Sequence, residues 1–403
     1  RSLYQRVVEY HPENREALLR LARVAFVEVD REQAVSRARR AIEAHPEDPE
    51  PRAELARFQL ALGDAEAALG TVRDALGRSP DHLGLRTLEG RALVAVGQPA
   101  EAASKLASVV EAVPGDVSAR FLLAWANSRA GRLTVAREHI EQVLQQVPDA
   151  TAARLFKAEV LARLGAMEQA EVLLRALRQD HPDEPAIHRL RGEVALAKGE
   201  TGEAIEAFRQ ARAQMTNNFL TIRLAQALER AGQPGRSREL LREWLEEHPG
   251  DVMTRGVLAD ALLAEGRFGA ARAHYERMVE RVPGHVSAHN NLAWAALQME
   301  DLQPAGRHAE RARELAPDEP QVLDTLALVR LKQGQAGEAV RLLRAALRKA
   351  EGDAGLRLHL AQALAAAGRD GQARRVLQEL LAAEAPFAGR ARAEELLTSL
   401  EQE

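Results

Sequence analysis

A spacing of 34 residues runs through almost the whole chain, and small side chains mark it at two fixed places. When each unit is numbered from one, position eight is always alanine or glycine and position twenty is alanine or serine. Position eight is occupied by Ala22, Ala56, Gly90, Ala124, Ala158, Gly192, Ala225, Ala259, Ala293, Ala327 and Ala361. Position twenty is occupied by Ala34, Ala68, Ala102, Ala136, Ala170, Ala204, Ser237, Ala271, Ala305, Ala339 and Ala373. Such a period predicts one helical hairpin repeated eleven times, with small residues where two helices approach closely.

Each unit contains two amphipathic segments, judged by apolar residues at i, i+3, i+4 and i+7. The complete units are expected over 15–48, 49–82, 83–116, 117–150, 151–184, 185–218, 219–251, 252–285, 286–319, 320–353 and 354–387. Residues 1–14 are expected to hold the second helix of a truncated repeat. Residues 388–403 are expected to form a helix that covers the apolar end of the last repeat.

The turn between the two helices is marked by glycine at position fifteen in nine units. These are Gly63, Gly97, Gly131, Gly165, Gly199, Gly232, Gly266, Gly334 and Gly368. A residue just past a helix end commonly takes the left-handed conformation, which glycine adopts without steric cost. Val29 and Glu300 stand at this position in the other two units, and they predict looser turns there.

The middle of the chain departs from the pattern. The sixth unit ends in Met215-Thr216-Asn217-Asn218 without the proline that closes most units, and the seventh is expected to be one residue short. Trp244 stands in the seventh unit where other units have alanine. Two interpretations are open: a local packing adjustment in which Trp244 fills space, or a kink near residues 215–219.

Composition excludes several classes of function. Apolar residues make up 46% of the chain and aromatic residues 3%, the net charge is −4, and no cysteine is present. Nucleic-acid binding needs a concentrated basic face, which this charge balance does not provide. No motif for a nucleophile, a phosphate loop or a zinc site occurs, and no apolar stretch is long enough to span a membrane. We therefore expect no catalysis, cofactor, metal site or nucleic-acid partner in this segment.

The spacings resemble those of the tetratricopeptide repeat (TPR) family. In the fourth unit the matching residues are Leu123, Ala124, Gly131, Ala136, Ile140 and Pro148. The resemblance implies an all-α, right-handed superhelical solenoid of about eleven repeats, with a half repeat at the start and a capping helix at the end. It also implies that positions two, five, nine, twelve and thirteen line a concave binding face for protein partners.

Position nine predicts a binding surface. Across the first four units it carries Arg23, Arg57, Arg91 and Trp125, and Phe121 lies one helical turn before Trp125. Arginine suits carboxylates, phosphates and sulfates, and the two rings offer an anchor for a peptide or a sugar. In the alternative interpretation the charges form an internal ladder. Glu89, Lys157 and Arg191 at position seven would then pair with charges at position nine (Arg91, Glu159 and Glu193) of adjacent helices.

A second candidate site lies in the ninth unit, which contains Asn290, Asn291 and Trp294. Paired asparagines on a TPR groove often hold a peptide backbone through their amides. A clamp for a C-terminal carboxylate also needs lysine and arginine nearby. The next unit offers Gln321, Asp324 and Thr325 instead, so that clamp is not expected.

The C-terminal third resembles a bacterial group of TPR proteins, those of the exosortase (PEP-CTERM) system. The resemblance rests on 290–294 (Asn-Asn-Leu-Ala-Trp), 323–326 (Leu-Asp-Thr-Leu) and 357–361 (Arg-Leu-His-Leu-Ala). It implies an envelope or periplasmic scaffold tied to exopolysaccharide assembly, export or surface protein sorting, with a cytoplasmic location as the alternative. Two further hypotheses are direct binding of an anionic polysaccharide and a TPR module of a larger enzyme.

Overall fold

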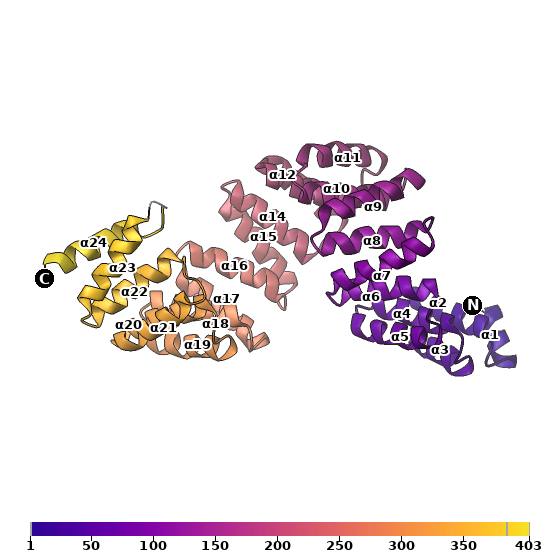
Figure 1. Cartoon of the computed structure of the whole chain (residues 1–403), viewed down its shortest axis with the longest axis horizontal. Coiled ribbons are helices and arrows are strands. Elements are labelled where there is room, and N and C mark those ends of the chain that lie inside the picture. The colour runs from indigo at the N-terminus through magenta and orange to yellow at the C-terminus, as the bar shows by residue number, and fades with distance from the viewer. Residues whose placement is uncertain (1, 384–385, 403) are drawn as a thin grey trace. The chain divides into compact units, whose positions relative to one another are not determined.

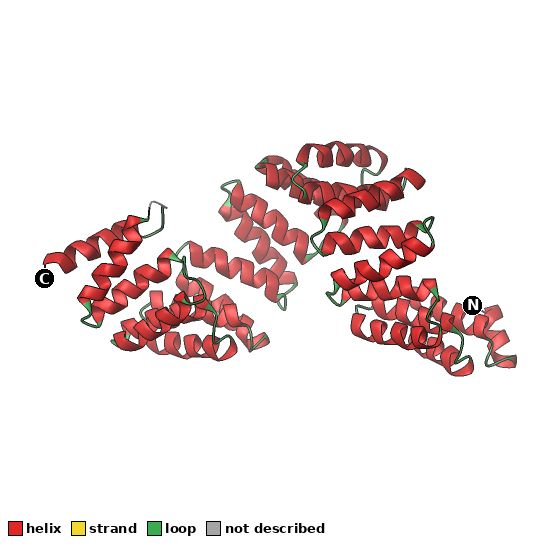
Figure 2. Ribbon diagram, in the orientation of Figure 1, coloured by secondary structure: helices red, strands yellow, loops and turns green. Residues whose placement is uncertain are grey.

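The computed structural model describes residues 2–383 and 386–402, and every regular element in these ranges is an α-helix (Figures 1 and 2). Residues 1, 384–385 and 403 belong to the expected half repeat, last repeat and capping segment, and lie outside the described residues. The chain divides into two compact units, Arg1–Gln214 and Met215–Glu403. We call them the N-terminal unit and the C-terminal unit.

The N-terminal unit is a run of helical hairpins in which each helix packs on the next one along the chain. Its helices are α1 (Ser2–Tyr10), α2 (Arg15–Val27), α3 (Arg31–Ala44), α4 (Pro49–Ala61), α5 (Ala65–Arg78), α6 (Leu83–Ala95), α7 (Pro99–Ala112), α8 (Val117–Arg129), α9 (Leu133–Gln146), α10 (Thr151–Arg163), α11 (Met167–Asp180), α12 (Pro185–Lys198) and α13 (Thr201–Gln214). Even-numbered helices are the first helices of the repeats.

The C-terminal unit continues the same arrangement. Its helices are α14 (Asn218–Arg230), α15 (Pro234–Glu247), α16 (Val252–Ala264), α17 (Phe268–Arg281), α18 (Val286–Gln298), α19 (Leu302–Leu315), α20 (Pro320–Lys332), α21 (Ala336–Leu347), α22 (Ala354–Ala366), α23 (Asp370–Ala382) and α24 (Arg390–Gln402). The fold is therefore all-α, a solenoid of repeated hairpins as the 34-residue spacing predicts.

The prediction of looser turns at Val29 and Glu300 was wrong. The glycines at position fifteen have positive φ, as at Gly97 (81°), and Val29 (65°) and Glu300 (59°) adopt the same left-handed conformation. The hydrogen bond that closes the turn is also kept: Asp30 N–H donates to the Ala25 carbonyl at 2.9 Å. Packing of the two helices fixes the turn, so the residue at this position accepts backbone strain rather than changing the turn.

Positions eight and twenty lie where the helices of one hairpin touch. The alanines at both positions are completely buried, and the two glycines at position eight have no room for a larger side chain. A Cβ added at Gly90 would lie 2.4 Å from Leu106 Cγ, and one at Gly192 would lie 2.7 Å from the Phe208 ring. Close packing across each hairpin therefore sets the size limit at position eight.

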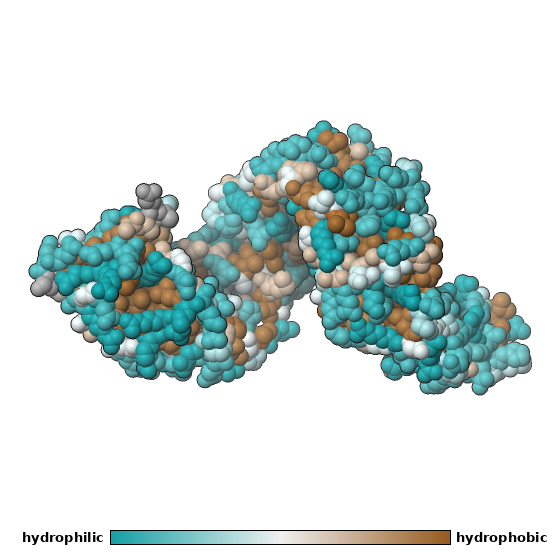
Figure 3. Space-filling model, in the orientation of Figure 1, coloured by the Kyte–Doolittle hydropathy of each residue, from teal (hydrophilic) through white to brown (hydrophobic). Residues whose placement is uncertain are grey.

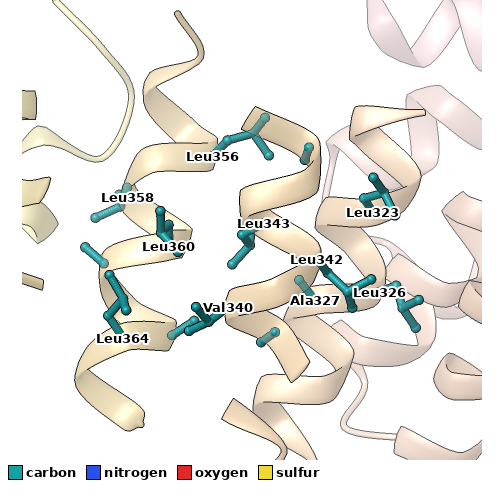
Figure 4. Packing of buried hydrophobic residues seen from close by; sticks show 14 of the residues in the cluster. Leu323, Leu326, Ala327, Val340, Leu342, Leu343, Leu356, Leu358, Leu360 and Leu364 are labelled. Carbon is teal, nitrogen blue, oxygen red and sulfur yellow. The ribbon is translucent and has the colours of Figure 1, made fainter. Parts of the chain in front are cut away.

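In the C-terminal unit one apolar core runs from α18 to the last helix. Its leucines interdigitate between consecutive first and second helices, as at Leu326, Leu343 and Leu360 (Figure 4). Helix α24 closes this core with Ala393 and Leu400, both buried. The apolar face that the last hairpin would otherwise expose is covered in this way.

In the middle of the chain, the repeat spacing is one residue shorter because the loop between two helices is shorter. Helix α13 ends at Gln214 and α14 begins at Asn218, so the connection contains three residues, 215–217, and the seventh repeat starts one residue earlier than expected. Trp244 is buried, stacks on His248 with ring centroids 3.8 Å apart, and donates to Asp251 at 2.7 Å. Trp244 thus fills space within its own repeat, whereas the kink near residues 215–219 stays a prediction.

In seven repeats a basic residue at position four ties the preceding inter-repeat turn to the helix that follows it, a contact that the repeat spacing does not predict. Its side chain donates to a backbone carbonyl six residues earlier, in the turn after the preceding second helix. These pairs are Arg52 with Pro46, Arg86 with Pro80, Arg120 with Pro114, His188 with Pro182, Arg255 with Pro249, His289 with Pro283 and Arg357 with Glu351. Each bond satisfies a backbone carbonyl of the turn, beyond the last residue of the preceding helix.

Candidate functional site

The predicted site residues occupy one surface of each unit, which we call the first-helix face. It is lined by positions five, six and nine of the first helices. The N-terminal unit contributes Arg23, Arg57, Arg91, Phe121 and Trp125, and the C-terminal unit contributes Asn290, Asn291 and Trp294. The eight residues therefore form two separate groups.

Two of the predicted arginines converge on one buried carboxylate. Arg23 donates from Nε and Nη2 to Glu54 at 2.8 and 3.0 Å, and Arg57 donates to the same group at 2.9 Å. Glu54 is only 4% exposed, and the two guanidinium groups lower its pKa against the opposing effect of burial. Part of the positive charge at this end of the first-helix face is therefore already compensated.

Arg91 is the exception among the three arginines. It is exposed on α6 and makes no hydrogen bond or ion pair within the described part of the chain. The corresponding neighbour in the next repeat is Leu122, which offers no carboxylate of the kind that Glu54 supplies to Arg23. Arg91 is thus the arginine most available to an anionic ligand on this face.

The predicted internal ladder, in which charges at position seven pair with charges at position nine, was wrong. Glu89 faces Arg73 and Lys105 of the flanking second helices at 3.5 and 3.8 Å, and Lys157 pairs with Glu141 at 3.1 Å. Glu193 pairs with Arg189 on its own helix. Residues two apart on a helix point to nearly opposite sides, so position seven faces the second helices. Position nine pairs instead with position six of the next repeat, as in Arg23 with Glu54.

The aromatic pair of the fourth repeat is half-buried. Phe121 and Trp125 both pack on the cluster around Ile140 and Phe156. The ring centroids of Phe121 and Phe156 lie 5.6 Å apart at a 54° angle, which is a favourable tilted arrangement. One side of each ring therefore supports the hydrophobic core, and the remaining exposed part is what a ligand could contact.

In the ninth repeat the two asparagines belong to a polar network with residues that sequence reasoning missed. Tyr275 donates to Asp260 Oδ1 at 2.5 Å, and Asn291 Nδ2 donates to Asp260 Oδ1 and to the Tyr275 hydroxyl, both at 3.1 Å. Burial and the adjacent Asp260 carboxylate raise the pKa of Tyr275. The tyrosine therefore keeps its proton and acts as a fixed donor. In the sequence, the one sign of this network is Asp260, an acidic residue at position nine of the preceding repeat.

Asn290 completes this arrangement. Its Nδ2 donates to Asn291 Oδ1 at 3.4 Å, while its own Oδ1 is buried without a hydrogen-bond partner. Trp294 lies one turn further along α18 and is half-buried against the apolar core. The partly exposed indole beside these amide groups is suited to an apolar side chain of a ligand.

Within residues 2–383 and 386–402, no group of three histidine, cysteine or acidic side chains is placed to hold a metal ion. Over the same ranges no helix combines the length and apolar character needed to cross a bilayer.

Several solved structures contain chains that are similar to this one. The crystal structure of the APC/C hetero-tetramer Cut9–Hcn1 is 14% identical at a TM-score of 0.47, covering 98% of this chain and 92% of that one. Yeast Tom70 has the same identity, TM-score and coverage of this chain, with 96% of its own chain covered. YrrB, described as a TPR protein with an unusual peptide-binding site, is 22% identical at a TM-score of 0.37 over 46% of this chain and 95% of its own. A comparison with curated proteins gives no match.

Family models give a more direct result. One model described as tetratricopeptide repeat matches residues 28–92, 128–194, 262–329 and 330–400, which is more than half of the chain. Two further tetratricopeptide repeat models match residues 87–140 and 218–261. Together with the repeated hairpins and the positive-φ turn at position fifteen, these matches show that the chain belongs to the tetratricopeptide repeat family.

Proposed function

We propose that this TPR chain is a non-catalytic scaffold that binds an extended segment of a protein partner on its first-helix face, in the bacterial envelope during exopolysaccharide assembly, export or surface protein sorting. Family membership supports protein binding as the general role. The resemblance of residues 290–294, 323–326 and 357–361 to the exosortase-system proteins supports the envelope role.

The observation that carries the binding part of the proposal is the arrangement around Asn290. Asn291 is held in place by Asp260 and Tyr275, so the paired amide groups are ordered before a partner arrives. The Asn290 Oδ1 atom is buried and lacks a donor, and a backbone N–H of an extended peptide would supply one once the Asn290 side chain rotates toward the partner. Trp294 would cover an apolar side chain of the same peptide.

Affinity purification from an exopolysaccharide-producing bacterium tests this proposal. The wild type is compared with the double variant Asn290→Ala, Trp294→Ala, and Gln298→Ala is the matched control because Gln298 is exposed on the same helix. We expect envelope proteins of polysaccharide assembly to be enriched by the wild type and by the control. The double variant should recover them at least about tenfold less well, since a central aromatic anchor and a buried hydrogen bond are lost. Recovery of cytosolic proteins only, or equal recovery by the double variant, would contradict the proposal.

An anionic polysaccharide is a second candidate ligand, favoured by Arg91 and Trp125. These side chains occupy position nine of consecutive repeats, and their helices α6 and α8 pack on each other. An exposed guanidinium next to an indole can bind an acidic sugar through ionic and stacking contacts. Titration with an acidic polysaccharide should change tryptophan fluorescence in the wild type but not in Trp125→Ala. No response in either protein would rule this candidate out.

A further inference from the structure

Position seven of the repeat holds an observation that the proposed function does not use. It is leucine in eight repeats and a charged residue in three, namely Glu89, Lys157 and Arg191. In the structure each of these three residues lines a cleft between consecutive second helices of the N-terminal unit. We call this surface the second-helix face. Each of the three charged residues at position seven therefore lines a cleft.

The Arg191 cleft lies between α11 and α13 and has a cavity of about 50 Å³. Arg191 Nη1 is buried there without a hydrogen-bond partner. Arg178 lines the same cleft and makes no hydrogen bond or ion pair within the described residues. A buried guanidinium N–H without an acceptor is costly to leave unpaired, so Arg191 Nη1 lacks a hydrogen-bond acceptor in this cleft.

The carboxylates nearby do not supply that anion. Glu171 is bound by Lys198 at 2.9 Å and by Arg175 at 2.8 Å, and Lys198 also holds Glu200 at 2.7 Å. Glu203 lines the cleft but forms no hydrogen bond or ion pair with Arg191. Burial, with Arg178 next in importance, lowers the pKa of Arg191. Arginine nevertheless stays charged at neutral pH.

An apolar groove runs along the opposite side of α11, between α9 and α11. Its cavity is about 660 Å³, and its lining includes Leu144, Leu161, Val172 and Leu173. Val172 is 63% exposed, although it lies in the middle of a helix. Lys157 lines this groove and is paired with Glu141. Figure 3 shows apolar patches among hydrophilic surface over the α8–α11 part of this unit.

We propose that α11 is the centre of a second docking site, on the second-helix face, for a segment of a partner protein that places a large apolar side chain in the α9–α11 groove and an aspartate or glutamate side chain in the Arg191 cleft. Charge complementarity selects this occupant. Glu171 and Glu200 are already bound by Lys198 or Arg175, whereas Arg178 forms no ion pair and Arg191 Nη1 has no acceptor, although Glu203 lines the same cleft. The groove on the other side of the same helix offers apolar surface. The site does not depend on the proposed function, because none of its residues lies on the first-helix face.

Selection from a displayed library of random 12-residue peptides tests the proposal, with wild-type protein as the target. The affinity of each recovered peptide is then measured by fluorescence anisotropy for the wild type and for Arg191→Leu, Val172→Glu and Glu89→Leu. Leucine is the usual residue at position seven, so Arg191→Leu and Glu89→Leu are matched changes in different clefts, and both proteins are expected to fold. The double variant Asn290→Ala, Trp294→Ala is included to separate the two faces.

We expect recovered peptides to combine an acidic residue with a large apolar one. Their affinity should fall at least about tenfold in Arg191→Leu and in Val172→Glu, and should weaken with added salt. Glu89→Leu and the first-helix-face double variant should bind them as the wild type does. The proposal is overturned if no recovered peptide loses affinity in Arg191→Leu, or if binding is lost in Glu89→Leu to the same extent. If the affinity purification contradicts the binding role of the first-helix face, the peptide affinities of Arg191→Leu and Val172→Glu still test the second-helix face independently.

Discussion

Two residues other than glycine adopt the positive φ that glycine adopts at the same position of the other repeats. Val29 and Glu300 have φ of 65° and 59° at position fifteen, and valine is especially disfavoured there because of its branched Cβ. Both are exposed, so neither side chain gains burial in return. The cost is accepted because the two helices on either side are held by their own packing.

Replacement of Val29 by glycine should therefore stabilise the protein by about 1 kcal/mol, the typical cost of a left-handed residue with a Cβ. The urea midpoint should rise, and exchange of the Asp30 amide hydrogen should slow. Gly97→Val is the mirror experiment. No atom lies within 4 Å of a Cβ added at Gly97, so its expected destabilisation reflects the backbone alone. An unchanged midpoint in both variants would show that the turn relaxes.

Gly192→Ala should destabilise the N-terminal unit by about 1–3 kcal/mol, because the new methyl group meets the Phe208 ring. Phe208→Leu in the same chain should recover part of this loss. Gly70→Ala is the control: Gly70 lies within α5 and its Cβ would meet nothing within 4 Å. The control should be neutral or slightly stabilising, since alanine favours helix. Thermal unfolding followed by circular dichroism measures all three.

At the scale of secondary-structure elements, the repeats are joined by hydrogen bonds as well as by apolar packing. The basic residue at position four reaches back to the turn of the preceding repeat. Arg52 is the most completely engaged example, donating to the Pro46 carbonyl at 2.6 Å and to Asp74 at 2.7 Å while only 6% exposed. Such a side chain fixes the connection between consecutive hairpins.

Arg52→Met should cost about 1.5–3 kcal/mol, the range for a buried hydrogen bond from a charged group. Hydrogen exchange should accelerate in the turn that contains Pro46 and in the first residues of α4. Arg39→Met is the matched control, because Arg39 is exposed on α3 and has no partner within the described residues. Equal effects of the two changes would show that the backbone contact contributes little.

The histidines at position twenty-three make stability depend on pH. Burial and then Arg255, Arg277 and Arg242 lower the pKa of His274 from 6.5 to about 4, and burial with the adjacent His289 also lowers the pKa of His308. Above pH 6.5 both states carry neutral His274. As pH falls from 6.5 to about 4, the unfolded chain binds a proton that the folded chain excludes, so stability decreases. His274→Gln should flatten the loss measured by urea unfolding over this window, and an unchanged slope would contradict this assignment.

Sequence alone predicted the parts of the fold that depend on residues within one repeat. Helix positions and small-residue contacts followed from the 34-residue spacing because every hairpin solves the same packing problem. Contacts between repeats were harder to predict. Glu54, which binds Arg23 and Arg57, lies one repeat away from Arg23. The partners of Glu89 lie on second helices, whose facing direction is set by how hairpins stack. In the sequence Tyr275 resembles an ordinary core residue, and only the structure shows that Asp260 and Asn291 bind its hydroxyl.

At the scale of the whole molecule, position within the repeat decides what a residue does. Positions eight and twenty pack the hairpin, a basic residue at position four joins seven of the hairpins to the preceding one, and position nine lies on the first-helix face. Position seven is a core leucine except where it lines a cleft. The binding surfaces proposed above therefore depend on a repeat numbering that is valid in both compact units.

Single-cysteine labelling tests that numbering most directly, because the chain has no cysteine of its own. One cysteine is placed at position eight or at position nine of the same helix, at Ala22 or Arg23 in α2 and at Ala225 or Gln226 in α14. The alanines are fully buried, whereas Arg23 and Gln226 are exposed. In each pair, cysteine at position nine should react with a thiol reagent at least about tenfold faster, since position eight reacts only when the hairpin opens. Equal rates for neighbouring positions in either unit would contradict the numbering and both binding surfaces derived from it.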